Sequence, residues 1–296
     1  MLRRKLLGLG LLAVLGRAGA ALAQSADPGF RNWLQGLKAE AVGKGVSSKT
    51  LGKALDGIEQ VPEVLELYAH QPEFKMSFQE YQTLVVSEKR VKQGREMLAK
   101  HRALLSRFSS LYGVPQSLIV ALWGIESNYG ERQGEFLVVP ALATLAYNGK
   151  RVQFFRGELI AALRIIDQGH IGATEMKGSW AGALGQCQFI PSSFLAYAAD
   201  GDGDGHNDIW NNTSDVFASI ANYMHRAGWR SSENWGKDVT GQPTPTTTPG
   251  TRIVRPAGAS GPTFLVTRNF ATILRWNQSD FFALSVGLLS DRISAP

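Results

Sequence analysis

The sequence has 296 residues, 44% of them hydrophobic, a single cysteine and a formal net charge of +6. Four basic residues, Arg3, Arg4, Lys5 and Arg17, lie in the first 23 positions, and the remainder carries 27 basic against 25 acidic residues. A balance this close to neutral gives no electrostatic basis for nucleic-acid binding. Cys187 alone cannot form an internal disulfide, so the core must hold the fold together.

The first 23 residues have the pattern of a secretory signal. A basic start, Met1 to Lys5, precedes an apolar run over 6–15 and the small-residue sequence that ends at Ala23. We expect cleavage after Ala23 and a soluble mature protein in the periplasm. The apolar run is too short to span a membrane, and no cysteine stands near the cleavage point to carry a lipid anchor.

Most of the mature chain shows helical periodicity. A helical N-terminal region is expected over 24–110, and it includes one long amphipathic helix over 87–108. A second helical region is expected over 111–235, with helices over 154–168 and up to residue 226. The predicted class is therefore mainly α.

Strand-like sequence is confined to the end of the chain, over 252–255 and 264–267. Residues 236–262 are rich in Thr, Pro and Gly, which predicts an exposed loop or a reduced β subdomain. The last segment, 263–296, completes the chain and adds a small β-containing part to the helical fold.

Glu126 stands at the end of an apolar segment, Leu118 to Gly130, which is predicted to be a helix. Leu118, Leu122 and Ile125 share one face, and Glu126 follows them directly. Apolar surroundings destabilise a carboxylate and raise its pKa, as a general acid near neutral pH requires. Alone, the segment favours a surface Glu at a helix end over a catalytic acid.

A second segment, Gly178 to Ser193, combines small residues with hydrogen-bonding and aromatic ones. Its glycines and alanines let the backbone approach a ligand closely, and Trp180 offers a stacking surface. This composition suits a polar, ring-shaped ligand such as a sugar.

At these residues the chain resembles the lytic murein transglycosylase B family, glycoside hydrolase family 103. Five pieces carry the resemblance in the family's order between about residues 28 and 293. They are the Glu126-Ser-Asn-Tyr-Gly segment, Gly182-Ala-Leu-Gly-Gln-Cys-Gln188-Phe-Ile-Pro-Ser, the Asp200 loop, Ala221-Asn-Tyr223 and Trp276-Asn277-Gln-Ser-Asp-Phe-Phe282. One such motif is weak evidence, whereas five in order form a specific pattern.

The resemblance implies a lysozyme-like catalytic core over 111–235 that cleaves peptidoglycan glycan strands. It also implies that the C-terminal segment, 263–296, returns to the catalytic cleft and that cell-wall synthesis complexes are possible partners. Glu126 alone would act as acid and then as base at the β-1,4 bond between N-acetylmuramic acid and N-acetylglucosamine. The sugar's own 6-hydroxyl would close a 1,6-anhydro ring without consuming water. The positions that match saccharide-contacting residues of the family are Tyr81, Ser179, Gln188, Tyr223, Asn277 and Phe282.

The loop from Asp200 to Asp208 alternates carboxylates with glycines, as an EF-hand loop does, and predicts a structural calcium site. Calcium prefers such oxygen ligands, and His206 would contribute its backbone carbonyl. The twelfth position is Asn211 instead of a bidentate Glu, and the resemblance makes Asp215 the closing ligand of a lengthened 200–215 loop. The predicted ligands are Asp200, Asp202, Asp204, His206 and Asp215.

Two other functions fit part of the pattern. A muramidase would hydrolyse the same bond with water, and it shares the fold and the acid. A catalytically inactive peptidoglycan-binding protein would keep the fold alone, which the intact Glu126 and Gln188 segments disfavour. The products distinguish the two enzymes, because a transglycosylase leaves 1,6-anhydro ends and a muramidase leaves reducing ends.

Overall fold

The computed structural model describes residues 27–70, 76–243 and 245–295, and the segment predicted as a secretory signal lies outside them. The prediction of a mainly helical chain is confirmed. The helices up to Glu126 are α1 (Pro28–Gly43), α2 (Ser48–Leu55), α3 (Pro62–Ala69), α4 (Phe78–Val85), α5 (Glu88–Lys100), α6 (Arg102–Tyr112) and α7 (Gln116–Ser127). Those after it are α8 (Val138–Asn148), α9 (Val152–Asp167), α10 (Pro191–Tyr197), α11 (Thr213–Arg226), α12 (Arg268–Trp276) and α13 (Asp280–Ser294).

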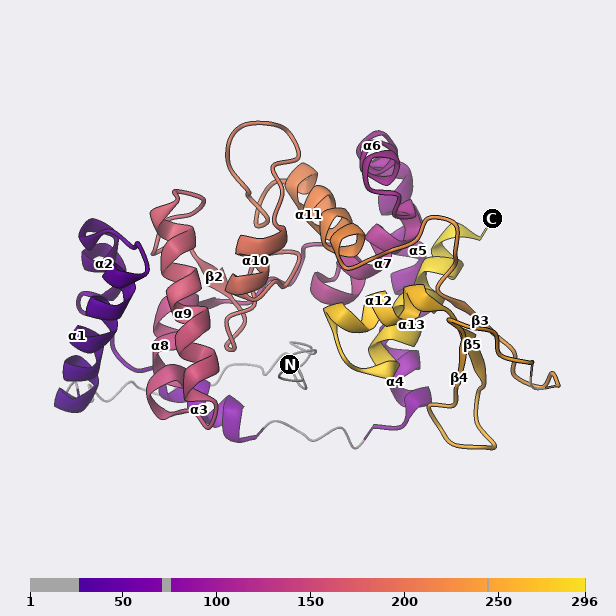
Figure 1. The fold of residues 1–296 in the computed structure, drawn as a ribbon, viewed down its shortest axis with the longest axis horizontal. Helices are drawn as coiled ribbons and strands as arrows, with labels where there is room; N and C mark the ends of the chain where they lie inside the picture. Colours follow the sequence, from indigo (N-terminus) through magenta and orange to yellow (C-terminus); the bar gives the residue numbers. More distant parts are fainter. Residues whose placement is uncertain (1–26, 71–75, 244, 296) are drawn as a thin grey trace.

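The helices form two groups that α10 and α11 join. The α8–α9 pair packs with α2 and α3, and α1 packs on α2. In the other group α7 packs against α5, α6, α11 and α13, while α10 contacts both α9 and α11. Figure 1 shows α1, α2, α8 and α9 at one end of the elongated molecule and α5, α7 and α13 toward the other.

The single long helix predicted over 87–108 is instead two helices, α5 and α6, with a break at His101. The break turns the His101 ring toward the aromatic core, where its centroid lies 5.3 Å from Phe217 and 5.9 Å from Trp123. Packing of one residue therefore overrides the continuous amphipathic pattern.

The strands are short. They are β1 (Phe136–Leu137), β2 (Lys177–Gly178), β3 (Gly236–Asp238), β4 (Arg252–Val254) and β5 (Phe264–Val266). The last three form an antiparallel sheet in the order β3-β5-β4, which confirms the two predicted strands as β4 and β5. The expectation of strands only near the end was wrong, because β1 pairs with β2. Two-residue strands are too short for alternation to reveal them.

Helix α7 is the central helix of the second group, with nine of its twelve residues buried. It begins after Pro115 and ends in three consecutive left-handed residues, Asn128, Tyr129 and Gly130, with φ of 51°, 60° and 87°. The Tyr129 hydroxyl donates to the Arg90 carbonyl of α5 at 2.7 Å, which fixes this strained end.

No single helix of the described residues is both long enough and apolar enough to span a bilayer. The bent pair α6 and α7, which meet at 110°, meets both conditions together by length and composition only.

Candidate active site

Glu126 lies in the last turn of α7, and its carboxyl group is half-buried among apolar residues. Burial raises the pKa of Glu126 to about 8, and a hydrogen bond from Trp276 opposes that rise. No carboxylate among the described residues adds to the shift. Glu126 therefore keeps its proton at neutral pH, and it does so without the second acid of a conventional glycosidase.

Trp276, the last residue of α12, donates its indole N–H to Glu126 Oε1 at 2.7 Å. The Tyr223 ring lies edge-on to the Trp276 ring, with 4.6 Å between centroids, and the Phe189 ring centroid is 5.2 Å away. The Tyr223 hydroxyl donates to the carbonyl of Arg275 at 2.7 Å. Tyr223 thus fixes the backbone that positions Trp276, and Trp276 in turn contacts the acid.

The predicted sugar-contacting segment is a compact series of turns beside α7. The backbone N–H of Ser179 donates to the Ala183 carbonyl at 2.9 Å, and the Ser179 hydroxyl accepts from the Ala183 N–H at 3.0 Å. A Cβ atom on Gly178 would lie 2.1 Å from the Ala183 carbonyl oxygen, so only glycine permits this approach. Ser179 itself remains half-exposed.

Gln186 attaches this segment to helix α7, and Gln188 attaches it to the loop after that helix. Gln186 accepts from the Trp123 indole N–H at 2.8 Å and donates to the Trp210 carbonyl at 2.8 Å. Gln188 has a φ of 48°, which strains a residue other than glycine. Its amide donates to the carbonyls of Gly185 and Gln133, at 2.8 and 3.1 Å. The amide nitrogen of Gln188 therefore holds backbone, and the amide oxygen is the atom left to meet a ligand.

The other three predicted contact residues differ in accessibility. Tyr81, on α4, is 2% exposed, and burial followed by the nearby Glu126 charge raises its pKa. Phe282 is 3% exposed, so its ring packs in the core, and the half-buried neighbour Phe281 lies against Tyr81. Asn277 is half-buried, and its side-chain oxygen accepts from the Ser279 N–H. The structure thus brings Tyr81 close to Glu126, and direct sugar contact by these three residues stays a prediction.

Sequence reasoning placed Trp276 in a motif of the resembled family and missed its hydrogen bond to Glu126. It also missed that Gln186 is buried and bonded to Trp123. The signal for Trp276 was its place in a motif of the resembled family, but its partner lies 150 residues away in the chain.

The acidic loop brings three exposed carboxylates together. Ligand oxygens of Asp200, Asp202 and Asp204 lie within 4.8 Å of one another. Asp200 accepts N–H groups of Gly203 and Gly205, at 2.6 and 2.8 Å, so the loop wraps around its carboxylate and lowers its pKa. An all-oxygen set of this kind fits Ca²⁺ better than softer metals.

Asp215 lies outside that 4.8 Å group. Burial is the main cause that raises the pKa of Asp215 to about 6, and the negative charges of Asp202 and Asp200 add to it. Its two oxygens accept the N–H groups of Gly201 and Asp208, at 2.7 and 2.6 Å. Asp215 thus joins the start of α11 to both ends of the loop. The backbone N–H of His206 donates to Asp204, and its ring is exposed.

Known proteins are similar to this chain in sequence and in fold. A family model described as "Transglycosylase SLT domain" matches residues 29–291. The "Membrane-bound lytic murein transglycosylase B" of Escherichia coli (strain K12) is 34% identical over 163 residues, which are 55% of this chain. The match spans 45% of that relative's length, so the chain corresponds to less than half of it.

Solved structures match over more of the chain. SltB3 from Pseudomonas aeruginosa, in complex with NAG-NAM-pentapeptide, is 36% identical with a TM-score of 0.85 and covers 92% of this chain and 81% of its own. The Escherichia coli lytic transglycosylase Slt35, in complex with calcium, is 27% identical with a TM-score of 0.77, over 90% of this chain and 93% of its own.

Proposed function

The chain belongs to the transglycosylase SLT domain family, and we propose that it is a lytic transglycosylase that cleaves peptidoglycan glycan strands. The observation that carries the proposal is Glu126, a single carboxyl group with a pKa raised to about 8 and an indole N–H on its oxygen. The relatives named above support the substrate class.

In the proposed reaction Glu126 transfers its proton to the glycosidic oxygen that links N-acetylmuramic acid to N-acetylglucosamine. The C1–O bond breaks, the leaving sugar keeps the proton, and the 2-acetamido group stabilises the electron-poor C1. Ionised Glu126 then takes the proton of the 6-hydroxyl of N-acetylmuramic acid, and the oxygen of that hydroxyl bonds to C1 of the same N-acetylmuramic acid. This restores the acid and forms a 1,6-anhydro ring. An intramolecular nucleophile benefits from effective molarity, so water need not enter.

The residues around Glu126 have distinct roles in this proposal. Trp276 steadies the ionised form that exists between the two steps, because its N–H donates to the carboxylate. Ser179, the Gln188 oxygen and Asn277 would fix the sugar, while Tyr81 and Tyr223 shape the cleft around the acid. Glu126 is the only one of these residues with a carboxyl group.

We further propose that Asp200, Asp202 and Asp204 hold a structural Ca²⁺, with the His206 carbonyl and Asp215 as the remaining candidate ligands. The clustered oxygens and the calcium complex of Slt35 support this site. When bound, the ion would offset two of the three negative charges of these carboxylates and fix the segment between the Gln188 turn and α11. For localisation, the pattern of the first 23 residues supports export to the periplasm.

The test is digestion of purified peptidoglycan sacculi, with mass spectrometry of the released fragments. Wild type is expected to give 1,6-anhydromuramic ends, and Glu126→Gln is expected to lose at least about 10²-fold in rate, because an amide has no proton to transfer. Glu135→Gln makes the same change at an exposed Glu in the loop after α7 and serves as the matched control. Reducing ends alone would indicate a muramidase, and activity of Glu126→Gln near wild type would exclude Glu126 as the acid.

A further inference from the structure

A pocket of about 530 Å³ lies beside α12 and is lined by eleven residues. Four of them are arginines, and none is an Asp or Glu. The arginines come from three segments: Arg230 follows α11, Arg252 begins β4, and Arg268 and Arg275 stand on α12. The hydroxyl-bearing residues Thr251, Thr267 and Thr272 complete the polar lining.

The positive charge of this arginine pocket is only partly neutralised. Arg268 forms an ion pair with Glu233 at 2.9 Å, and Arg252 forms one with Asp280 at 3.2 Å. Arg230 and Arg275 have no ion pair with any described residue. Two guanidinium charges therefore remain available, and like charges held around one hollow favour an anionic ligand.

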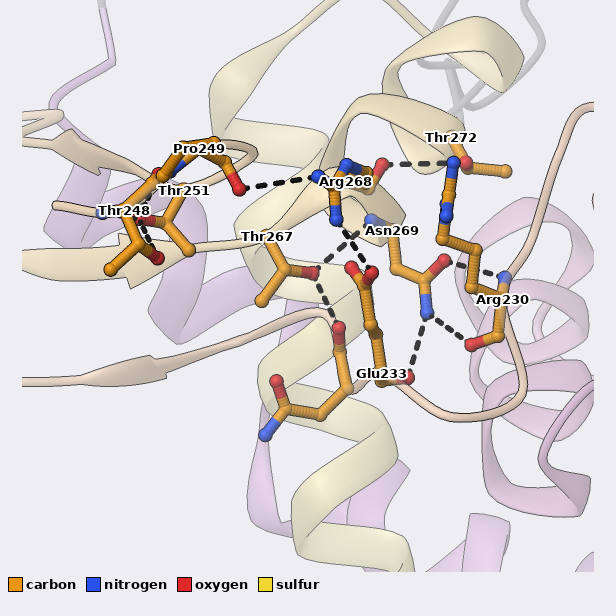
Figure 2. Close-up of polar contacts among 10 residues, drawn as sticks. Arg230, Glu233, Thr248, Pro249, Thr251, Thr267, Arg268, Asn269 and Thr272 are labelled. Atoms are coloured by element: carbon orange, nitrogen blue, oxygen red, sulfur yellow. Dashed lines mark hydrogen bonds and ion pairs between the residues drawn. The ribbon is translucent and has the colours of Figure 1, made fainter.

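Hydrogen bonds fix the walls of the arginine pocket, as Figure 2 shows. The fully buried Asn269 side chain accepts from the Arg230 N–H and donates to the carbonyls of Arg230 and Glu233, at 2.7 to 2.8 Å. Arg268 also donates to the Pro249 carbonyl at 3.2 Å, which ties the loop before β4 to α12. The arginines thus stand on backbone that is positioned before a ligand arrives, and this lowers the cost of binding.

The arginine pocket is linked to the acid through consecutive residues. Arg275 lines the pocket, and the next residue, Trp276, contacts Glu126. The Arg275 guanidinium donates to the Ala227 carbonyl at 2.7 Å, and its own carbonyl accepts from Tyr223. Since an α-helix rises about 1.5 Å per residue, the pocket extends from the end of α12 near the acid to roughly 10 Å further along it.

We propose that the arginine pocket binds carboxylates of the peptide attached to the glycan, so that the protein recognises peptide-bearing strands. This inference rests on the proposed function, since it names a second part of the same substrate. Guanidinium groups pair with carboxylates through two parallel N–H donors, and the Thr hydroxyls can bind peptide groups between them. A concave hollow of this size suits a short peptide end better than a flat membrane surface.

The test measures binding in the Glu126→Gln background, where no turnover occurs. NAG-NAM-pentapeptide and the same disaccharide without its peptide are titrated by calorimetry. The peptide-bearing probe is expected to bind more tightly, and Arg230→Glu is expected to weaken only that probe, by roughly threefold to tenfold. Arg164→Glu on α9 makes the same charge change at an exposed site outside the pocket and is expected to leave both affinities unchanged.

Arg230→Gln, which removes the charge without reversing it, should give a smaller loss, and melting temperatures verify that each variant folds. Equal affinity of the two probes, or an equal loss for both in Arg230→Glu, would overturn the proposal. So would Arg230-dependent binding to phosphatidylglycerol vesicles without binding of the peptide. Wild-type cleavage of peptide-bearing sacculi is measured in parallel, because its absence would refute the proposed function rather than the arginine pocket.

Discussion

Replacing Trp276 by Phe tests whether the indole N–H sets the proton affinity of Glu126. The substitution keeps an aromatic ring beside Tyr223 and Phe189 but removes the donor to Glu126 Oε1. Burial already raises the pKa of Glu126 to about 8, and the Trp276 bond lowers it. Loss of the bond destabilises the ionised form, so the pKa of Glu126 must rise further in the variant.

The size of the shift follows from the bond. A hydrogen bond to a charged group contributes about 1.5 to 3 kcal/mol when buried, and partial exposure of Glu126 reduces this to roughly 1.4 kcal/mol, or about one pH unit. The proposed reaction starts with protonated Glu126, so wild-type kcat/KM should fall as pH rises through about 8. In Trp276→Phe the same fall should occur near pH 9, about one unit higher.

The assay is the pH dependence of kcat/KM on a soluble peptidoglycan fragment. The shape of the profile carries the information, because the altered ring can also lower the rate at every pH. Trp33→Phe removes an indole N–H from α1, where Trp33 stacks on Phe30, and should leave the profile in place. A falling limb that stays fixed or moves to lower pH in Trp276→Phe would refute this account of the acid.

Two further perturbations follow from the same structure. Removal of Ca²⁺ by chelation should lower the melting temperature, and the double variant Asp202→Ala, Asp204→Ala should abolish that response. If millimolar calcium does not change the melting temperature of the metal-free wild type, the loop is a turn that binds no calcium. Glu126→Gln should stabilise the protein near neutral pH by about 1 to 2 kcal/mol, after allowance for the partial exposure of Glu126. The raised pKa of Glu126 makes the wild type lose stability as pH rises from about 4.5 to 8, and the uncharged amide has no such loss. Melting temperatures measured across that range should diverge with rising pH, and parallel curves would contradict the burial of Glu126.

The local parts of the site could be predicted from sequence, and the contacts between distant segments could not. Glu126 follows an apolar helical face, and that pattern lies within a dozen residues. The donor to its oxygen comes from Trp276, and no periodicity relates two residues so far apart in sequence. The resemblance placed both residues in motifs of one family, but it assigned neither the bond nor its effect on the pKa.

The acidic loop shows a similar division. The alternating aspartates predicted that three carboxylates would gather, and they do. Asp215 was expected to join them, whereas both of its oxygens accept backbone N–H groups in this structure. Spacing in sequence cannot decide between these roles, because either one brings the start of α11 to the loop. Whether Asp215 also ligates calcium stays a prediction.

In the reaction that we propose, one carboxyl group acts first as acid and then as base, so it must not prefer either state strongly. In water the pKa of Glu126 would be near 4.5, and the group would have no proton to give at neutral pH. Burial alone would raise this pKa, but it would also destabilise the ionised Glu126 that must accept the proton of the 6-hydroxyl. The Trp276 N–H stabilises that form, and the Tyr223 bond to the Arg275 carbonyl keeps the indole in place. Opposing effects of burial and one fixed donor can therefore adjust one residue for both steps, without a second acid.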